Sequence, residues 1–223
     1  EPDIIELQSI LLKKAPVILL KSSPMIDISR AIQDLKFVKE VHVISVKNEC
    51  KELFFIINNH FSEDEISINC VNLSPVQQPE NYIFTLENEK NLPLLQSVTS
   101  IQSYLYEPNS SILKAGAFKS VAISFSISKI HKNSHLYTSN KLITDFPGRI
   151  FTVKAVIPFS GKVLKKLSMQ YPSANITVRN FPITTEELRK KSKIKDGGNI
   201  YIFATTLYPD KKIFIICEKI INA

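Results

Sequence analysis

Glycine is scarce in this chain, and its distribution excludes several kinds of site. The 223 residues contain only five glycines, and none lies within the first 115 positions. A loop that holds a nucleotide phosphate or a nucleoside cofactor needs glycine where its backbone approaches the ligand at a strand-to-helix turn. The sequence has no Gly-x-Gly pattern and no Walker loop. We therefore expect no cofactor bound to this chain alone.

Cysteines and long apolar runs are also few. Cys50, Cys70 and Cys217 form no Cys-x-x-Cys pair, which argues against a disulfide framework and favours a reducing compartment. No apolar run approaches the roughly 18 to 20 residues that span a bilayer. The chain begins with Glu1 and shows no signal-peptide pattern. These features predict a cytoplasmic protein without a membrane partner, trimmed at its start.

The positive charge is concentrated in the last third of the chain. Residues 149–223 contain 14 Lys and Arg against 5 Asp and Glu, whereas residues 1–148 contain 14 against 16. The net charge of +7 therefore comes entirely from the C-terminal part. A basic region beside a near-neutral one predicts a polyanionic partner, most commonly a nucleic acid. The alternative is a solvated basic surface without a partner.

The first 60 residues alternate between helical and extended patterns. We expect helices at 4–14 and 28–35 and strands at 17–21, 40–48 and 49–58. Asp27 is placed to cap the second helix, and the last two strands are close enough to form a hairpin. This order is typical of the second half of a doubly wound sheet whose last strand runs antiparallel.

Such a half-sheet would leave one strand edge uncovered. The run VILLK at 17–21 is continuously apolar, as expected of a strand that is buried on both faces. An apolar edge of this kind promotes association with other strands. Either strands that precede this chain or a second chain should therefore cover it.

The rest of the chain divides at FPGR, residues 146–149. Before it, strands are expected at 65–73, 81–87 and 120–127, and a helix capped by Asn109 or Ser110 ends near Gly116. After it, a compact α/β pattern predicts strands at 150–157, 174–180, 199–207 and 212–220, with helices at 160–170 and 184–193. The second of these helices carries a capping-box pattern.

The stretch LRKKSKIKDGGNIYIFATTL, residues 188–207, could be a phosphate-binding glycine loop or a basic surface. Gly197 and Gly198 precede a strand rather than a helix, which favours a tight turn. His131 and His135 are four residues apart, but they lie in a loop-like segment without a third ligand, so we expect no metal site. No catalytic constellation is complete within the chain.

Long segments resemble a known family. VILLKSSPMIDISRAIQDL and VHVISVKNECKELFFII look like the later sheet strands of a group of bacterial class I S-adenosylmethionine-dependent methyltransferases. YLYEPNSSILKAGAFK resembles the start of the ferredoxin-like segment of those enzymes. FPGRIFTVKAVIPFSGKVLKKL and the basic stretch that follows resemble their THUMP-like domain.

The resemblance also implies what this chain lacks. The glycine-rich cofactor loop and the acidic-proline motif of such enzymes would precede Glu1, in a missing N-terminal half. The resemblance implies S-adenosylmethionine as cofactor of the full-length protein and RNA, often tRNA, as the partner of the THUMP-like domain. The residues that would border the missing active site are Lys21, Ser22, Ser23, Pro24 and Asp27.

The basic residues of the last third are the expected RNA contacts. They fall on the two predicted helices and the turn after them, which form one basic strip if both helices share a sheet face. The residues are Lys162, Lys165, Lys166, Arg189, Lys190, Lys191, Lys193 and Lys195. Arg179 and Tyr201 are candidates for stacking on unpaired bases, although Tyr201 lies in an apolar strand and is better explained as a core residue.

The sequence thus predicts an α/β chain in three parts. Residues 1–60 form the C-terminal half of a Rossmann-like methyltransferase sheet, 61–148 a connector with a ferredoxin-like segment, and 149–223 a basic THUMP-like domain. The function expected is substrate binding, and one side of the cleft, in a methyltransferase that acts on RNA. A non-enzymatic RNA-binding module and a structural assembly domain remain as alternatives.

Overall fold

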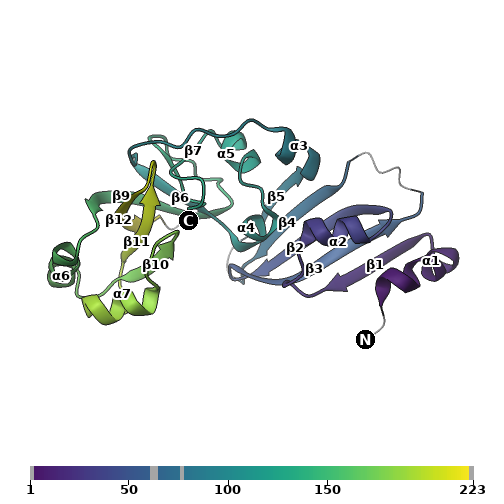
Figure 1. The fold of residues 1–223 in the computed structure, drawn as a ribbon, viewed down its shortest axis with the longest axis horizontal. Coiled ribbons are helices and arrows are strands. Elements are labelled where there is room, and N and C mark those ends of the chain that lie inside the picture. The colour runs from purple at the N-terminus through teal and green to yellow at the C-terminus, as the bar shows by residue number, and fades with distance from the viewer. Residues whose placement is uncertain (1–2, 61–64, 76–77, 221–223) are drawn as a thin grey trace. The chain divides into compact units, whose positions relative to one another are not determined.

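The computed structural model describes residues 3–60, 65–75 and 78–220. The chain divides into two compact units (Figure 1). The first comprises Glu1–Pro93 and Asn109–Ser120, and the second comprises Leu94–Pro108 and Val121–Ala223. Each unit contains its own β-sheet and core.

The first unit is a five-stranded mixed sheet with short helices. Its elements are α1 (Ile4–Lys14), β1 (Val17–Ser22), α2 (Ile28–Asp34), β2 (Val38–Val46), β3 (Glu49–Asn58), β4 (Ser67–Leu73), β5 (Glu80–Thr85), α3 (Leu86–Asn91) and α4 (Ser110–Ala115). The strand order is β1-β3-β2-β4-β5. Because β3 runs antiparallel to both β1 and β2, the predicted half-sheet with a returning last strand is present. Strands β4 and β5 continue this sheet beyond residue 60.

The hairpin between β2 and β3 turns at two residues with positive φ. Lys47 has a φ of 51° and Asn48 a φ of 61°, as in the two-residue turns whose twist matches that of paired strands. The alternation along these strands buries Val41, Leu53 and Phe55 completely on one face. Helix α4 packs against β2, β3 and β4.

Strand β1 differs from the prediction that it is buried on both faces. Among the described strands only β3 pairs with it, so β1 forms an edge of the sheet. Its residues alternate between exposed and partly buried, and Leu19 is 65% exposed. Burial on both faces requires further covering elements, and the described residues supply none over Val17 and Leu19.

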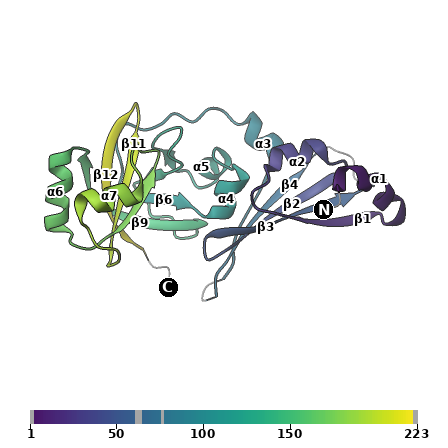
Figure 2. The same cartoon turned by 60° about the horizontal axis from the view of Figure 1, so that its bottom comes forward.

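The second unit is a seven-stranded sheet. Helices cover one of its faces, and loops cover the other. Its elements are β6 (Tyr104–Pro108), α5 (Ser120–Ser124, which begins on the last residue of the first unit), β7 (Ser128–Lys129), β8 (Tyr137–Ser139), β9 (Gly148–Pro158), α6 (Gly161–Gln170), β10 (Asn175–Arg179), α7 (Thr185–Ser192), β11 (Ile200–Leu207) and β12 (Lys211–Lys219). The strand order is β10-β11-β12-β9-β6-β8-β7. Figure 2 shows α6 and α7 beside β11 and β12.

Two hydrophobic clusters stabilise this sheet. On one face, Leu164 and Leu167 of α6 and Leu188 of α7 pack with Ile202 and Phe214. A second cluster joins buried residues of β6, β9, β11 and β12 to residues of the covering loops: Leu105, Phe151, Phe203, Ile215, Ile130 and Leu136. The two helices therefore share one face, which was the condition for a single basic strip.

The segment 120–127 was predicted as a strand, and this prediction is wrong. Residues 120–124 form helix α5, and the amide of Phe125 donates to the carbonyl of Val121. The Glu89 carboxylate accepts the amides of Phe118, Lys119 and Ser120 at 2.8 to 3.1 Å. Free amides at a helix start need such acceptors, and this one comes from about 30 residues earlier in the chain.

Candidate nucleic-acid interface

Helix α6 presents three lysines to solvent. Ser160 caps its first turn by accepting the amide of Val163 at 3.2 Å. Leu164 and Leu167 point into the core, so the intervening positions of the helix face outward. The exposed lysines are Lys162, Lys165 and Lys166.

Helix α7 and the turn after it add four exposed lysines. The predicted capping box is present, because Thr184 accepts the amide of Glu187 and Glu187 accepts the amide of Thr184. Leu188 is buried against the sheet. The lysines are Lys190, Lys191, Lys193 and Lys195.

We call these seven lysines the α6–α7 lysine surface. The two helices contact each other on the same sheet face. Within residues 3–60, 65–75 and 78–220, no ion pair involves any of the seven. Their charges are therefore not neutralised by neighbouring carboxylates, which is the electrostatic condition for contacting a polyanion.

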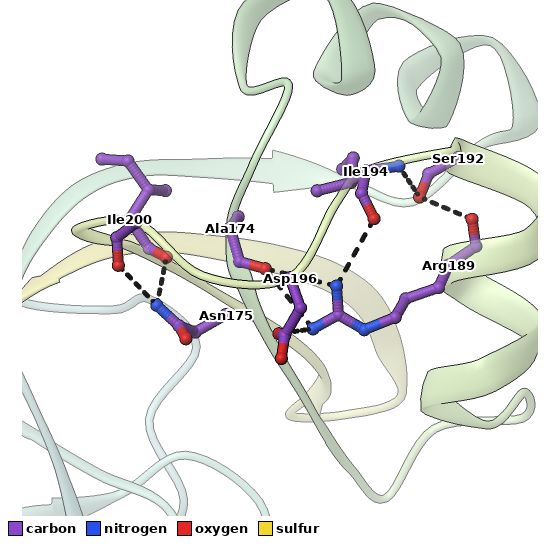
Figure 3. Close-up of polar contacts among 8 residues, drawn as sticks. Ala174, Asn175, Arg189, Ser192, Ile194, Asp196 and Ile200 are labelled. Carbon is purple, nitrogen blue, oxygen red and sulfur yellow. Dashed lines mark hydrogen bonds and ion pairs between the residues drawn. The ribbon is translucent and has the colours of Figure 1, made fainter.

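Arg189 belongs to the same helix but turns inward (Figure 3). Its guanidinium donates to the carbonyls of Ala174 and Ile194, each at 3.4 Å, and forms an ion pair with Asp196. The side chain thus links α7 to the residue before β10 and to the turn before β11. Although the sequence placed Arg189 among the RNA contacts, its contacts here are with the protein itself.

The Asp196-Gly197-Gly198 segment is a tight turn. Gly197 and Gly198 have φ values of 101° and 83°, a region that side chains with a Cβ rarely adopt. Asn175 holds the turn by donating to the Gly198 carbonyl at 2.7 Å. Its side-chain amide also donates to the Ile200 carbonyl at 3.3 Å (Figure 3). A Cβ on Gly198 would lie 3.1 Å from the Ser173 hydroxyl. These glycines serve the turn that leads into β11, as the sequence favoured.

Arg179 lies at the end of β10 in an ion cluster. Its guanidinium is 2.8 Å from the buried carboxylate of Glu107, which also accepts from Arg149 Nε at 2.7 Å. The Arg149 guanidinium lies over the rings of Phe151 and Phe203, at 5.5 and 6.0 Å from their centroids. The sequence contained no signal for Glu107 and Arg149, because they are 42 residues apart and lie in unrelated motifs.

Tyr201 is a core residue, as the sequence favoured. Its ring lies 5.1 Å from that of Phe151 and packs against the loop-covered cluster of the second unit. Arg179 keeps 40% of its side chain exposed, so it can still contact a ligand from its place beside Glu107. Because the Tyr201 ring is partly buried against the core, Arg179 is the stronger of the two predicted stacking candidates.

The residues predicted to border a cleft lie at the end of β1 in the first unit. Lys21 is exposed and forms an ion pair with Glu52 at 3.3 Å. Asp27 caps α2 by accepting the amide of Arg30 at 2.8 Å, as predicted, and the Ser23 hydroxyl accepts the amide of Met25 at 3.2 Å. Ser22 and Pro24 are partly buried. The polar atoms of this turn thus stabilise its local structure.

Two negative findings apply to the described residues. No group of three or more His, Cys, Asp or Glu side chains is placed to hold a metal ion there. Nor does that part of the chain contain a helix that is long and apolar enough to cross a membrane.

Comparison with known proteins identifies two domains. Residues 104–147 match the model of a ferredoxin-like domain, and residues 148–219 match that of a THUMP-like domain. The ferredoxin-like match spans both compact units, since Asn109–Ser120 belongs to the first. No curated protein matches the chain.

A solved structure extends the similarity to nearly the whole chain. It is the crystal structure of a protein from Porphyromonas gingivalis W83 that is named as a candidate methyltransferase. The two share 40% sequence identity with a TM-score of 0.92, over 98% of this chain and 55% of that one. This chain therefore spans about half the length of that protein. The present chain is a mixed α/β protein in which a ferredoxin-like domain is followed by a THUMP-like domain.

Proposed function

We propose that this chain is the substrate-binding part of an S-adenosylmethionine-dependent methyltransferase that acts on RNA. The α6–α7 lysine surface is the observation that carries the proposal. Its seven exposed lysines, without ion-pair partners among the described residues, lie on the two helices that share one face of the sheet in the THUMP-like domain and on the turn that follows them. Lysines arranged in this way contact phosphates and position an RNA, while they carry little base specificity themselves.

The methyl-transfer part of the proposal is supported by the similarity to the candidate methyltransferase. The cofactor does not fit the residues present here. The turn at the end of β1 has no glycine, and Ser23 and Asp27 already accept backbone amides. We therefore place the cofactor-binding loop in a segment outside this chain, and we derive no catalytic step from these residues.

The exposed edge of β1 supports a preceding methyltransferase half as the main partner. Val17 and Leu19 project from an edge strand that has no second partner among the described strands. The relative is also nearly twice as long as this chain. Strands added to this edge would bring Lys21 and Ser22 to the border of a cleft. The three free cysteines are consistent with a cytoplasmic enzyme.

The test is binding of labelled bulk tRNA to the 223-residue chain at two salt concentrations. We expect binding that weakens steeply with salt. The Lys190→Glu, Lys191→Glu, Lys193→Glu triple variant should bind much more weakly and with a flatter salt dependence. Absence of binding at low salt, together with stable oligomers in sedimentation, would contradict the proposal and favour a structural assembly domain.

A methyltransferase assay separates the enzyme from a non-enzymatic RNA-binding module. The natural protein, with its upstream segment, should transfer labelled methyl groups from S-adenosylmethionine to RNA. Retained RNA binding without any transfer would favour the binding module.

A further inference from the structure

The second unit contains a cavity of about 600 Å³ that the proposed function leaves unassigned. It lies among three loops: residues 95–97, residues 131–132 and the turn at 208–210 between β11 and β12. Its lining residues are Leu95, Gln96, Ser97, His131, Lys132, Tyr208, Pro209 and Asp210. A volume of this size falls within the range of small-ligand pockets, and a wall with both apolar and polar groups is typical of them.

His131 supplies the cavity with a hydrogen-bond donor in a fixed orientation. Its side chain is only 5% exposed. The backbone amide of Asn133 donates to His131 Nδ1 at 3.2 Å, and the side-chain amide of Asn180 contacts the same atom at 3.0 Å. Because a backbone amide can only donate, Nδ1 is the acceptor and the ring proton lies on Nε2.

The partners of His131 are themselves held in place. The carbonyl of Asn180 accepts the Thr206 hydroxyl, and Thr206 also accepts from Lys212 Nζ at 2.7 Å. The backbone of Tyr208 is fixed as well, since its amide donates to the Ile130 carbonyl at 3.0 Å. The imidazole and the Tyr208 backbone are thus positioned before any ligand binds.

Asp210 places an acceptor next to this donor. His131 Nε2 lies 3.5 Å from Asp210 Oδ1, at the outer limit for a hydrogen bond. The Asp210 side chain is 84% exposed and free to adjust. A donor and an acceptor side by side match the hydrogen-bonding edge of a nucleobase, because each base carries an adjacent donor and acceptor on its Watson–Crick edge.

The other walls suit a base and its phosphate. Tyr208 is about half exposed, and with Pro209 it provides a surface on which an aromatic base can stack. Lys132 is exposed at the same cavity and can reach a phosphate. We propose that this cavity binds one unpaired nucleobase with its phosphate, read by His131 and Asp210 and stacked on Tyr208.

The base comes from the RNA or from a free nucleotide. An RNA source for the base rests on the proposed function. The same contacts would recognise the base of a free nucleotide. The residues that line the cavity come from the loops at 95–97, 131–132 and 208–210 and not from α6 or α7. Base recognition and the α6–α7 lysine surface can therefore be tested separately.

The experiment is an NMR titration of the labelled chain with AMP, GMP, CMP and UMP, with ribose 5-phosphate as the control that lacks a base. We expect the nucleotides to shift the signals of Gln96, Lys132 and Asp210, and ribose 5-phosphate, which keeps the phosphate, to leave those of Gln96 and Asp210 unchanged. Tyr208→Ala should weaken nucleotide binding by about 5- to 160-fold, the range that stacking contributes. Tyr208→Phe keeps the ring and should bind like the wild type.

Three results would overturn the inference: equal shifts with ribose 5-phosphate, nucleotide shifts confined to residues outside the cavity, or unchanged affinity in Tyr208→Ala. Crosslinking with RNA that contains 4-thiouridine identifies the source, and a crosslink at Lys132 or Tyr208 assigns the site to RNA. Salt-sensitive tRNA binding without nucleotide shifts would contradict base binding in the cavity but would agree with the proposed function. Nucleotide shifts without tRNA binding would contradict the proposed function and leave a free-nucleotide site.

Discussion

The Arg179 guanidinium lies 2.8 Å from the Glu107 carboxylate, although three strands separate β10 from β6 in the sheet. In a flat sheet, four strand spacings of about 4.8 Å would put these strands about 19 Å apart. The ion pair therefore shows that the sheet curls strongly, beyond ordinary twist. Arg149 binds the same carboxylate from β9, so two guanidinium groups surround one buried acidic group.

Removal of the Glu107 charge should destabilise the second unit. Glu107→Gln leaves two guanidinium groups facing a neutral amide, and we expect the unfolding free energy to fall by about 2 to 4 kcal/mol. Glu218→Gln is the control, because its ion pair with Lys154 is about half exposed and should contribute less than about 1 kcal/mol. Hydrogen exchange of β9 amides in urea measures both variants. If both variants lost a similar amount of unfolding free energy, this would contradict a structural role for the ion cluster around Glu107.

The lysines of α6 should contribute to RNA affinity through charge alone. In the Lys162→Gln, Lys165→Gln, Lys166→Gln variant, we expect the slope of log affinity against log salt to fall by about 2. The loss should be similar for RNAs of different sequence, because phosphate contacts carry no base information. Filter binding across a salt series measures the slope. Equal effects from Lys13→Gln, Lys14→Gln, Lys36→Gln in the first unit would indicate nonspecific attraction instead.

Local signals in the sequence predicted much of the fold. The pattern of apolar residues located β2, β3, β11 and β12, and the caps at Asp27 and Thr184 are present as expected. Turn chemistry placed the Gly197-Gly198 turn before β11. In each case the residues that determine the structure lie within a few positions of one another, so periodicity and capping rules apply directly.

Long-range contacts account for the wrong prediction at α5 and for features that the sequence did not predict. Helix α5 depends on Glu89, and the inward turn of Arg189 depends on carbonyls that the fold brings near it. The cavity around His131 joins loops that are more than 70 residues apart in the chain. No local sequence pattern indicates contacts between residues so far apart in the chain. The exposure of Leu19 was also missed, because an apolar run does not reveal whether the other side of its strand is covered.

This chain should not bind S-adenosylmethionine by itself. Its first unit has no glycine except Gly116, which ends helix α4 with a φ of 80°. Without a glycine-rich strand-to-helix turn, the backbone cannot approach a nucleoside cofactor closely. Isothermal titration calorimetry should therefore show no binding heat at micromolar ligand. A saturable signal would show that these residues form a cofactor site without an upstream segment.

The open edge of β1 predicts different costs for two leucine truncations. Leu19→Ala should lower the stability of the first unit by less than about 1 kcal/mol, since the side chain is mostly exposed. Leu53→Ala in the adjacent strand β3 removes a fully buried side chain and should cost about 2 to 5 kcal/mol. Urea denaturation followed at first-unit amides compares them. An equally large cost for Leu19→Ala would mean that a second copy covers this edge in solution.

His135 should make the stability of the second unit depend on pH. Burial, followed by the charges of Lys129 and Arg179, lowers the pKa of His135 from 6.5 to about 4. Between these values the unfolded chain binds the proton and the folded chain does not, so stability decreases as the pH falls from 6.5 to 4. His135→Asn should remove this part of the dependence, because Asn tolerates the φ of 51° at this position. The difference between wild type and variant, measured by hydrogen exchange at several pH values, isolates His135 from carboxylates that titrate in the same range. Parallel curves for the two proteins would contradict the assignment.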